Sequence, residues 1–177
     1  MKRLKILFFS LICLLFITRG NVFAQVTPPV SATGQIFAEI IPVFSASETS
    51  QMNFGRFSPG PQGGQIILTP ESTISVLGSV FTGTGTHNAA SFYVTGDIDA
   101  AYSITLPTNP VVLTHTAIAK TMLVKDWVSI PSPGIGAGML QDGFQVVYVG
   151  ATLSVGTLYD NPVGVYTGSY TITFDFN

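Results

Sequence analysis

The feature that most constrains the fold is the alternation of side chains over the last fourteen residues, GVYTGSYTITFDFN. Side chains on a β-strand point to opposite faces in turn, so this stretch predicts a strand with one aromatic face and one threonine-rich face. The aromatic and aliphatic face carries Tyr166, Tyr170, Ile172, Phe174 and Phe176. Because an unpaired strand edge promotes association, this strand either closes the sheet of its own domain or pairs with another protein. In the first case these side chains are ordinary core residues, and the sequence leaves both alternatives open.

The remainder of the chain repeats short alternating segments separated by Gly, Pro, Asn and Asp. No segment shows the 3.6-residue periodicity of an amphipathic helix. The predicted strands cover residues 32–44, 51–54, 65–68, 73–80, 91–94, 102–106, 111–114, 121–130, 145–155 and 165–176. The predicted loops cover residues 58–64, 83–88 and 131–138, with a turn at residues 160–162. Many short strands without helical crossovers predict an all-β fold, built as an antiparallel sandwich or barrel.

The first 24 residues have the pattern of a secretory signal peptide. Three positive charges in residues 1–5 precede an apolar run at residues 6–17, and Val22-Phe23-Ala24 resembles a cleavage site. The apolar run is shorter than the roughly 20 residues that a membrane-spanning helix needs. Cleavage after Ala24 leaves residues 25–177 as a single domain, which we expect in the periplasm, on the cell surface or outside the cell.

The composition of residues 25–177 excludes several classes of function. The only cysteine, Cys13, lies in the predicted signal peptide, so neither a disulfide nor a thiolate metal site is expected in the exported domain. Three Lys and Arg residues remain against nine Asp and Glu residues. Nucleic acid is therefore an improbable partner, since phosphate binding needs clustered positive charge.

Candidate catalytic and metal-binding residues are few. His87 and His115 stand in polar surroundings, without a neighbouring carboxylate or a second histidine at metal-ligand spacing. Asp97 and Asp99 are close enough in sequence to share a turn, but a calcium site takes six to eight oxygen ligands. We therefore expect no catalytic residue, no metal and no cofactor.

Several segments resemble a known family. In residues 32–57 a long apolar stretch leads to Met52-Asn53-Phe54-Gly55, which is similar to the opening of bacterial fimbrial-subunit and spore-coat-protein-U-like domains. The segments ASFYVTGDIDAAYSITLP at residues 90–107, VGATLSVG at residues 149–156 and GVYTGSYTITFDF at residues 164–176 follow in order. Together they resemble the domain-of-unknown-function family 4402, which is associated with pilin-like folds.

This resemblance implies an immunoglobulin-like, pilin- or adhesin-like antiparallel β-sandwich behind a cleaved signal peptide. In assemblies of fimbrial subunits an incomplete sandwich accepts a strand from its neighbour. The candidate partners are then further copies of this chain or a periplasmic chaperone. The strands that would carry such pairing are the last one, described above, and the first one, through Ile36, Ala38 and Ile40.

Two functions follow as hypotheses. The first is a noncatalytic structural or adhesion protein of the cell envelope or surface, acting through strand pairing. The second is a secreted module that binds a glycan or another polymer, in which aromatic side chains stack on sugar rings. The candidate ligand-facing aromatics are Trp127, Tyr148 and Tyr159, although Trp127, the single tryptophan, is equally suited to anchoring a core.

Overall fold

The computed structural model describes residues 29–40 and 43–176. The chain divides into two units, residues 1–39 and residues 40–177. The predicted signal peptide lies outside the described residues. Among the residues that the structure does describe, no helix is long and apolar enough to cross a membrane.

The first predicted strand, residues 32–44, is wrong over residues 32–40 and 43–44, while residues 41–42 lie outside the described residues. Residues 29–40 contain neither helix nor strand, and their side chains are exposed. Ile36 is 99% exposed and Ile40 is 98% exposed. An alternating sequence becomes a strand only where a second backbone pairs with it, and no described backbone pairs with this segment.

The second unit is built entirely of antiparallel strands over its described residues, which confirms the predicted all-β sandwich class. Eight strands form a large sheet in which β1, β4, β9, β7, β6 and β10 follow in order, while β2 pairs with β9 and with β3. A smaller sheet has the order β11, β5, β8. The strands are β1 (Ser45–Ser50), β2 (Phe57–Leu68), β3 (Ile74–Thr82), β4 (Ala90–Thr95), β5 (Ala101–Thr105), β6 (Val111–His115), β7 (Thr121–Ile130), β8 (Gly134–Met139), β9 (Phe144–Val155), β10 (Tyr166–Thr167) and β11 (Thr173–Phe176).

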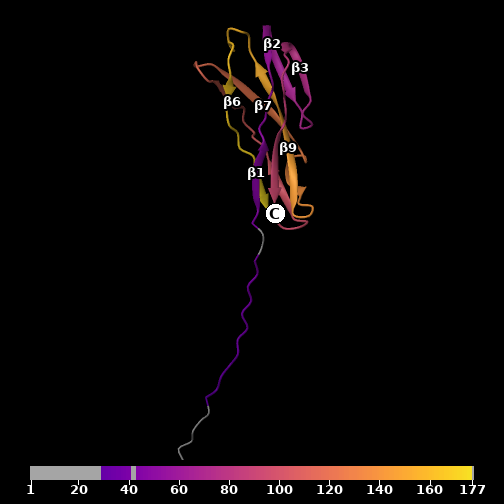
Figure 1. Ribbon diagram of the computed structural model, residues 1–177, viewed down its shortest axis with the longest axis vertical. Helices are drawn as coiled ribbons and strands as arrows, with labels where there is room; N and C mark the ends of the chain where they lie inside the picture. Colours follow the sequence, from indigo (N-terminus) through magenta and orange to yellow (C-terminus); the bar gives the residue numbers. More distant parts are fainter. Residues whose placement is uncertain (1–28, 41–42, 177) are drawn as a thin grey trace, which may run out of the picture. The chain divides into compact units, whose positions relative to one another are not determined.

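Strand β9 is the central strand of this unit and pairs with β2, β4 and β7. Strands β2 and β3 lie beside one end of β9, and β1 lies near the other end (Figure 1). Along one edge, its first half pairs with β4 and its second half with β2. The change of partner falls at Gly150, where an added Cβ would lie 2.2 Å from the carbonyl oxygen of Leu68. A glycine is therefore needed where β2 leaves the sheet.

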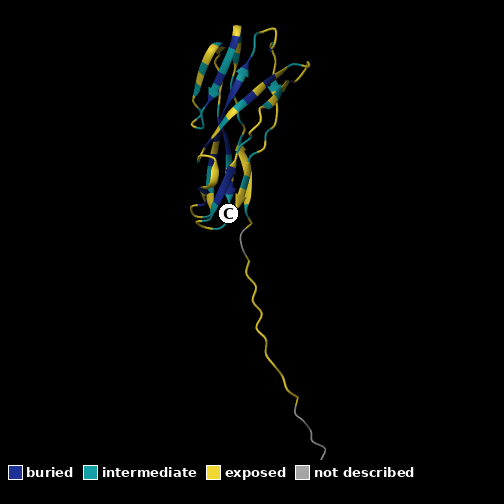
Figure 2. Cartoon of the chain, turned by 180° about the vertical axis from the view of Figure 1, so that it is seen from behind, coloured by how far each residue is buried: buried dark blue, intermediate teal, exposed yellow. Residues whose placement is uncertain are grey.

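The inward side chains of β9 supply two cores, which appear as the dark strand interiors in Figure 2. The first core contains Ile66, Val80, Met122, Val124, Ala151, Leu153 and Val155, all from the large sheet. The second core contains Ala90, Val94, Tyr102, Ile104, Leu140, Val147 and Val149, and the small sheet covers it. The small sheet does not cover the first core, against which Met52 and Phe54 from an irregular segment and Tyr166 from the two-residue strand β10 pack instead.

Two predicted loops are wrong because glycine-rich sequence forms strands here. Residues 58–64 belong to β2, whose register against β3 shifts between Pro59 and Gly64. Gly63 and Gly78 have φ values of 66° and 83°, a left-handed conformation that glycine adopts without strain. Most of the predicted loop at residues 131–138 is β8, where Gly138 packs directly against the ring of Tyr102.

Two predicted strands are also corrected. Residues 51–54 make only an isolated bridge, between Asn53 and Asn88. The last predicted strand, residues 165–176, divides into β10, which pairs with β6, and β11, which pairs with β5. Residues 168–172 pass from the large sheet to the small one, and so cannot continue either ladder.

Candidate functional site

A groove lies over the open side of the first core. It consists of two cavities of about 500 Å³ each, which share Met52, Phe54, Leu113 and Tyr166 in their linings. One wall is residues 51–59, where the chain enters β2, and the other is residues 162–170, around β10. We call this feature the open groove.

The floor of the open groove is apolar and comes from three neighbouring strands. Val111 and Leu113 belong to β6, Met122 and Val124 to β7, and Leu153 to β9. Met122, Val124 and Leu153 are at most 5% exposed and belong to the first core. The groove therefore reaches the hydrophobic interior of the domain, which a further strand or an apolar ligand could cover.

Both walls leave main-chain groups outside any sheet ladder. Between residues 51 and 56 the Asn53–Asn88 bridge is the one strand-like pairing among the described residues. In the other wall, β10 pairs with β6 only at Tyr166 and Thr167, and residues 168–172 pair with no described strand. An added strand needs main-chain N–H and C=O groups that are not already paired in a sheet, beside an apolar surface that its side chains can cover.

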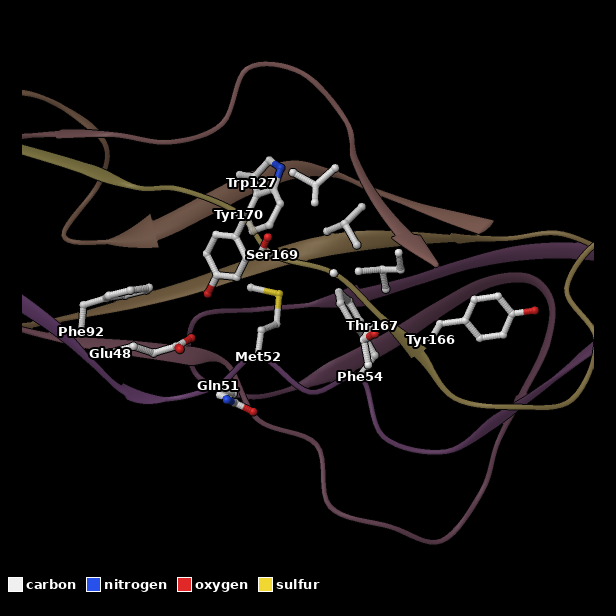
Figure 3. A pocket seen from close by; sticks show the side chains of 14 residues that line it. Glu48, Gln51, Met52, Phe54, Phe92, Trp127, Tyr166, Thr167, Ser169 and Tyr170 are labelled. Atoms are coloured by element: carbon white, nitrogen blue, oxygen red, sulfur yellow. The ribbon is translucent and has the colours of Figure 1, made fainter. Parts of the chain in front are cut away.

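At one end of the groove, Tyr170 lies between Trp127 and Phe92 (Figure 3). The ring centroids of Trp127 and Tyr170 are 4.7 Å apart. Neither the indole Nε1 of Trp127 nor the hydroxyl of Tyr170 has a hydrogen-bond partner within the described chain, although this hydroxyl points towards the Glu48 carboxylate. Burial raises the pKa of Tyr170, and the negative charge of Glu48 raises it further.

Hydrogen bonds of the His115 side chain hold the groove wall around β10 in place. Its Nδ1 accepts hydrogen bonds from the backbone N–H groups of Ala117 and Ile118, at 3.0 and 3.3 Å. Its Nε2 is consequently the protonated nitrogen of the neutral ring, and it donates to the carbonyl oxygen of Val163 at 3.2 Å. The ring also packs edge-on against Tyr166, with centroids 4.9 Å apart. His115 thus has a structural role beside the groove.

The predicted assembly residues fall in three places. Tyr166 and Tyr170 line the open groove. Ile172 and Phe174 pack against the second core, as Tyr170 also does, and Phe176 contacts Phe44 with ring centroids 4.7 Å apart. The remaining three predicted residues, Ile36, Ala38 and Ile40, lie in the exposed segment 29–40.

The three predicted ligand-facing aromatics do not share a surface. Trp127 lines the groove, whereas Tyr148 is 45% exposed on the outer face of β9. Tyr159 is 84% exposed in a loop, where the Nζ of Lys120 lies 4.7 Å from its ring centroid. The outer face holds two aromatics that sequence reasoning missed, Tyr93 and Phe144, stacked with centroids 5.5 Å apart. Because Tyr93 is flanked by Phe92 and Val94, no alternation marked it as an outward side chain.

No group of three or more His, Cys, Asp or Glu side chains in the described parts of the chain is placed to hold a metal ion. A model of the family described as "Domain of unknown function (DUF4402)" matches residues 44–176. No curated protein and no solved structure matches the chain.

Proposed function

This chain belongs to the DUF4402 family, and we propose that it is a noncatalytic structural protein of the bacterial cell envelope or surface that assembles by β-strand pairing, as fimbrial subunits do. The observation that carries this proposal is the open groove. Among the described residues, no second sheet covers the core to which its apolar floor belongs. Part of each wall, residues 51–56 apart from the Asn53–Asn88 bridge and residues 168–170, lies outside any ladder.

Strand addition matches the dimensions and the chemistry of the groove. Each wall contributes about nine residues, which offers main-chain groups on both sides of an added strand. Main-chain hydrogen bonds to the walls would provide affinity, and alternate side chains directed at Leu113, Met122 and Leu153 would provide specificity.

Export is the second part of the proposal. It is supported by the signal-peptide pattern of residues 1–24. An exported strand-acceptor domain would meet its partners in the periplasm or at the surface, and a chaperone could cover the groove before assembly.

The test is the size of the protein extracted from its native envelope and run on a denaturing gel with and without boiling. We expect a ladder of species in the unboiled lane that collapses to one band on boiling, because a paired strand resists detergent. A single monomer band in both lanes would contradict assembly by strand exchange.

A second candidate function is the binding of a neutral polysaccharide on the outer face of β4 and β9. The observation that favours it is the uncharged aromatic group of Tyr93, Phe144 and Tyr148, each between 38% and 45% exposed. Aromatic rings on an exposed sheet can stack on sugar rings. In sedimentation with insoluble cellulose or chitin, Tyr148→Ala should reduce binding and Tyr159→Ala, in a separate loop, should not. Failure of the unaltered protein to sediment would exclude this candidate for these polymers.

A further inference from the structure

We propose that the strand which fills the open groove is the segment of residues 34–40 from a second copy of this chain. This inference rests on the proposed strand-pairing function and names its partner. Two features of the described chain suggest it. The open groove contains no strand between its walls, and the apolar, alternating residues 34–40 pair with no described strand.

The segment has the composition of an inserted strand. Gly34, Ile36, Ala38 and Ile40 would share one face of an extended strand, while Gln35, Phe37 and Glu39 would point the other way. Ile36, Phe37 and Ile40 are between 86% and 99% exposed. Seven extended residues span about 23 Å, which fits within either wall of the groove. Burying Ile36 and Ile40 against the groove floor would remove their apolar surface from water.

The charges at the groove are compatible with this occupant. Glu48 is the one charged residue lining the cavity near Trp127, and Arg56 is the one lining the cavity near Val163. Arg56 is exposed and forms no ion pair with any described residue. Attraction between the Glu39 carboxylate and the Arg56 guanidinium would therefore set the direction of the inserted segment. Glu39 would lie at the Arg56 end of the groove and Gly34 at the Glu48 end.

Chain length favours a second copy over the same copy. The segment precedes Val43 in the chain, and β1 then runs from Ser45 to Ser50, with Glu48 at the edge of the groove, before the wall of residues 51–59. If the segment turned back on its own domain, Ile36, seven residues before Val43, would reach only the far end of β1. The apolar residues Ile36, Ala38 and Ile40 would then lie along β1 and reach the groove only at its Glu48 edge. A neighbouring copy has no such restriction.

The first experiment compares two charge variants of the full mature chain. Ile36→Asp with Ile40→Asp places charge on the face directed into the groove, and Thr33→Asp with Gln35→Asp places the same charge on the opposite face. Since these side chains are exposed, neither variant should change the melting temperature of the monomer. We expect the first variant to lose the boiling-sensitive ladder and the second to keep it.

The second experiment locates the contact. Trp127 is the only tryptophan in the chain and lines the groove. A synthetic peptide of residues 32–40 is titrated into the Ile36→Asp/Ile40→Asp variant while Trp127 emission is recorded. We expect a saturable shift to shorter wavelength, and no shift with a control peptide that carries Asp at positions 36 and 40.

The outcomes separate this inference from the proposed function. A ladder that persists in the Ile36→Asp/Ile40→Asp variant, or no response of Trp127 to the peptide, would overturn the choice of occupant while leaving strand pairing intact. Absence of a ladder from the unaltered protein would contradict strand-pairing assembly itself. Loss of the ladder together with the Trp127 shift would establish residues 34–40 as the inserted strand.

Discussion

At the scale of single residues, the second core depends on the contact between Tyr102 and Gly138. Tyr102 is fully buried, and its hydroxyl donates a 2.7 Å hydrogen bond to Oε1 of Gln145. Its ring occupies the space above Gly138, where an added Cβ would lie 2.2 Å from Cζ. The small and the large side chain therefore form one packing unit, in which neither can change size alone.

We predict that Gly138→Ala lowers the free energy of unfolding by about 1–3 kcal/mol, because the buried ring cannot move away without disturbing its neighbours. Urea denaturation measures the loss. Gly85→Ala is the matched control, since an added Cβ there would meet Arg56 Cγ at an ordinary 3.5 Å. Equal stability of the two variants would show that the Tyr102 ring is not confined.

The same tyrosine predicts a loss of stability in alkali. Burial raises the pKa of Tyr102 from 10.0 to about 12. Between these values the unfolded chain releases the phenolic proton while the folded chain retains it, so the free energy of unfolding falls as the pH rises through this window. The expected fall is on the order of 2 kcal/mol. It should be smaller in Tyr102→Phe when unfolding is measured at pH 9 and pH 12, and an unchanged pH dependence would assign the effect elsewhere.

At the scale of secondary-structure elements, β10 is two residues long and depends on contacts beyond its ladder. His115 bonds three main-chain groups across the turn after β6 and the segment before β10. An added Cβ at Gly164 would lie 1.9 Å from its Nε2, so the chain packs directly against the ring. One wall of the open groove is therefore positioned by one buried imidazole.

We predict that His115→Ala lowers the free energy of unfolding by about 1–3 kcal/mol, because it leaves these main-chain groups without partners. The amides of Tyr166 and Thr167 should also exchange with solvent faster than those of β7 or β9. Hydrogen exchange read by NMR tests this directly. His87→Ala, in an exposed loop, should change neither quantity, and unchanged protection of β10 in His115→Ala would refute the anchoring role.

Elements with regular alternation were predictable from sequence. The predicted strand at residues 121–130 coincides with β7, and those at residues 91–94 and 111–114 differ from β4 and β6 by at most one residue at either end. The failures lie where pairing decides the structure. Alternation cannot show that residues 32–40 lack a partner, or that the last strand must cross between two sheets.

The candidate site was only partly predictable for a related reason. Alternation correctly placed Tyr166 and Tyr170 on the inward face. It could not distinguish Leu113, Met122 and Leu153 from ordinary core residues, because a periodic pattern identifies an apolar face without showing whether a second sheet covers it. The open groove exists because the small sheet covers only the second core.

At the scale of the whole molecule, the second unit is a sandwich over one core, whereas the other core is covered by Met52, Phe54 and Tyr166 rather than by a second sheet. An apolar core lined by irregular segments is stabilised by any strand that covers it. If residues 34–40 of a neighbouring copy provide that strand, this segment acts as a ligand of the domain. Its concentration then equals the concentration of the protein. Folding and assembly are then linked by mass action.

We therefore predict that the melting temperature of the unaltered mature protein rises with protein concentration. A hundredfold increase, once the groove is largely occupied, adds about 2.7 kcal/mol to the free energy of unfolding. For a domain of this size that corresponds to a rise of roughly 5–10 °C. Differential scanning calorimetry over this concentration range measures the rise, with Thr33→Asp/Gln35→Asp behaving like the unaltered chain. The Ile36→Asp/Ile40→Asp variant should melt at one temperature throughout, because its groove stays empty at every concentration. A concentration dependence equal to that of the unaltered chain in this variant would mean that the copies associate through another surface.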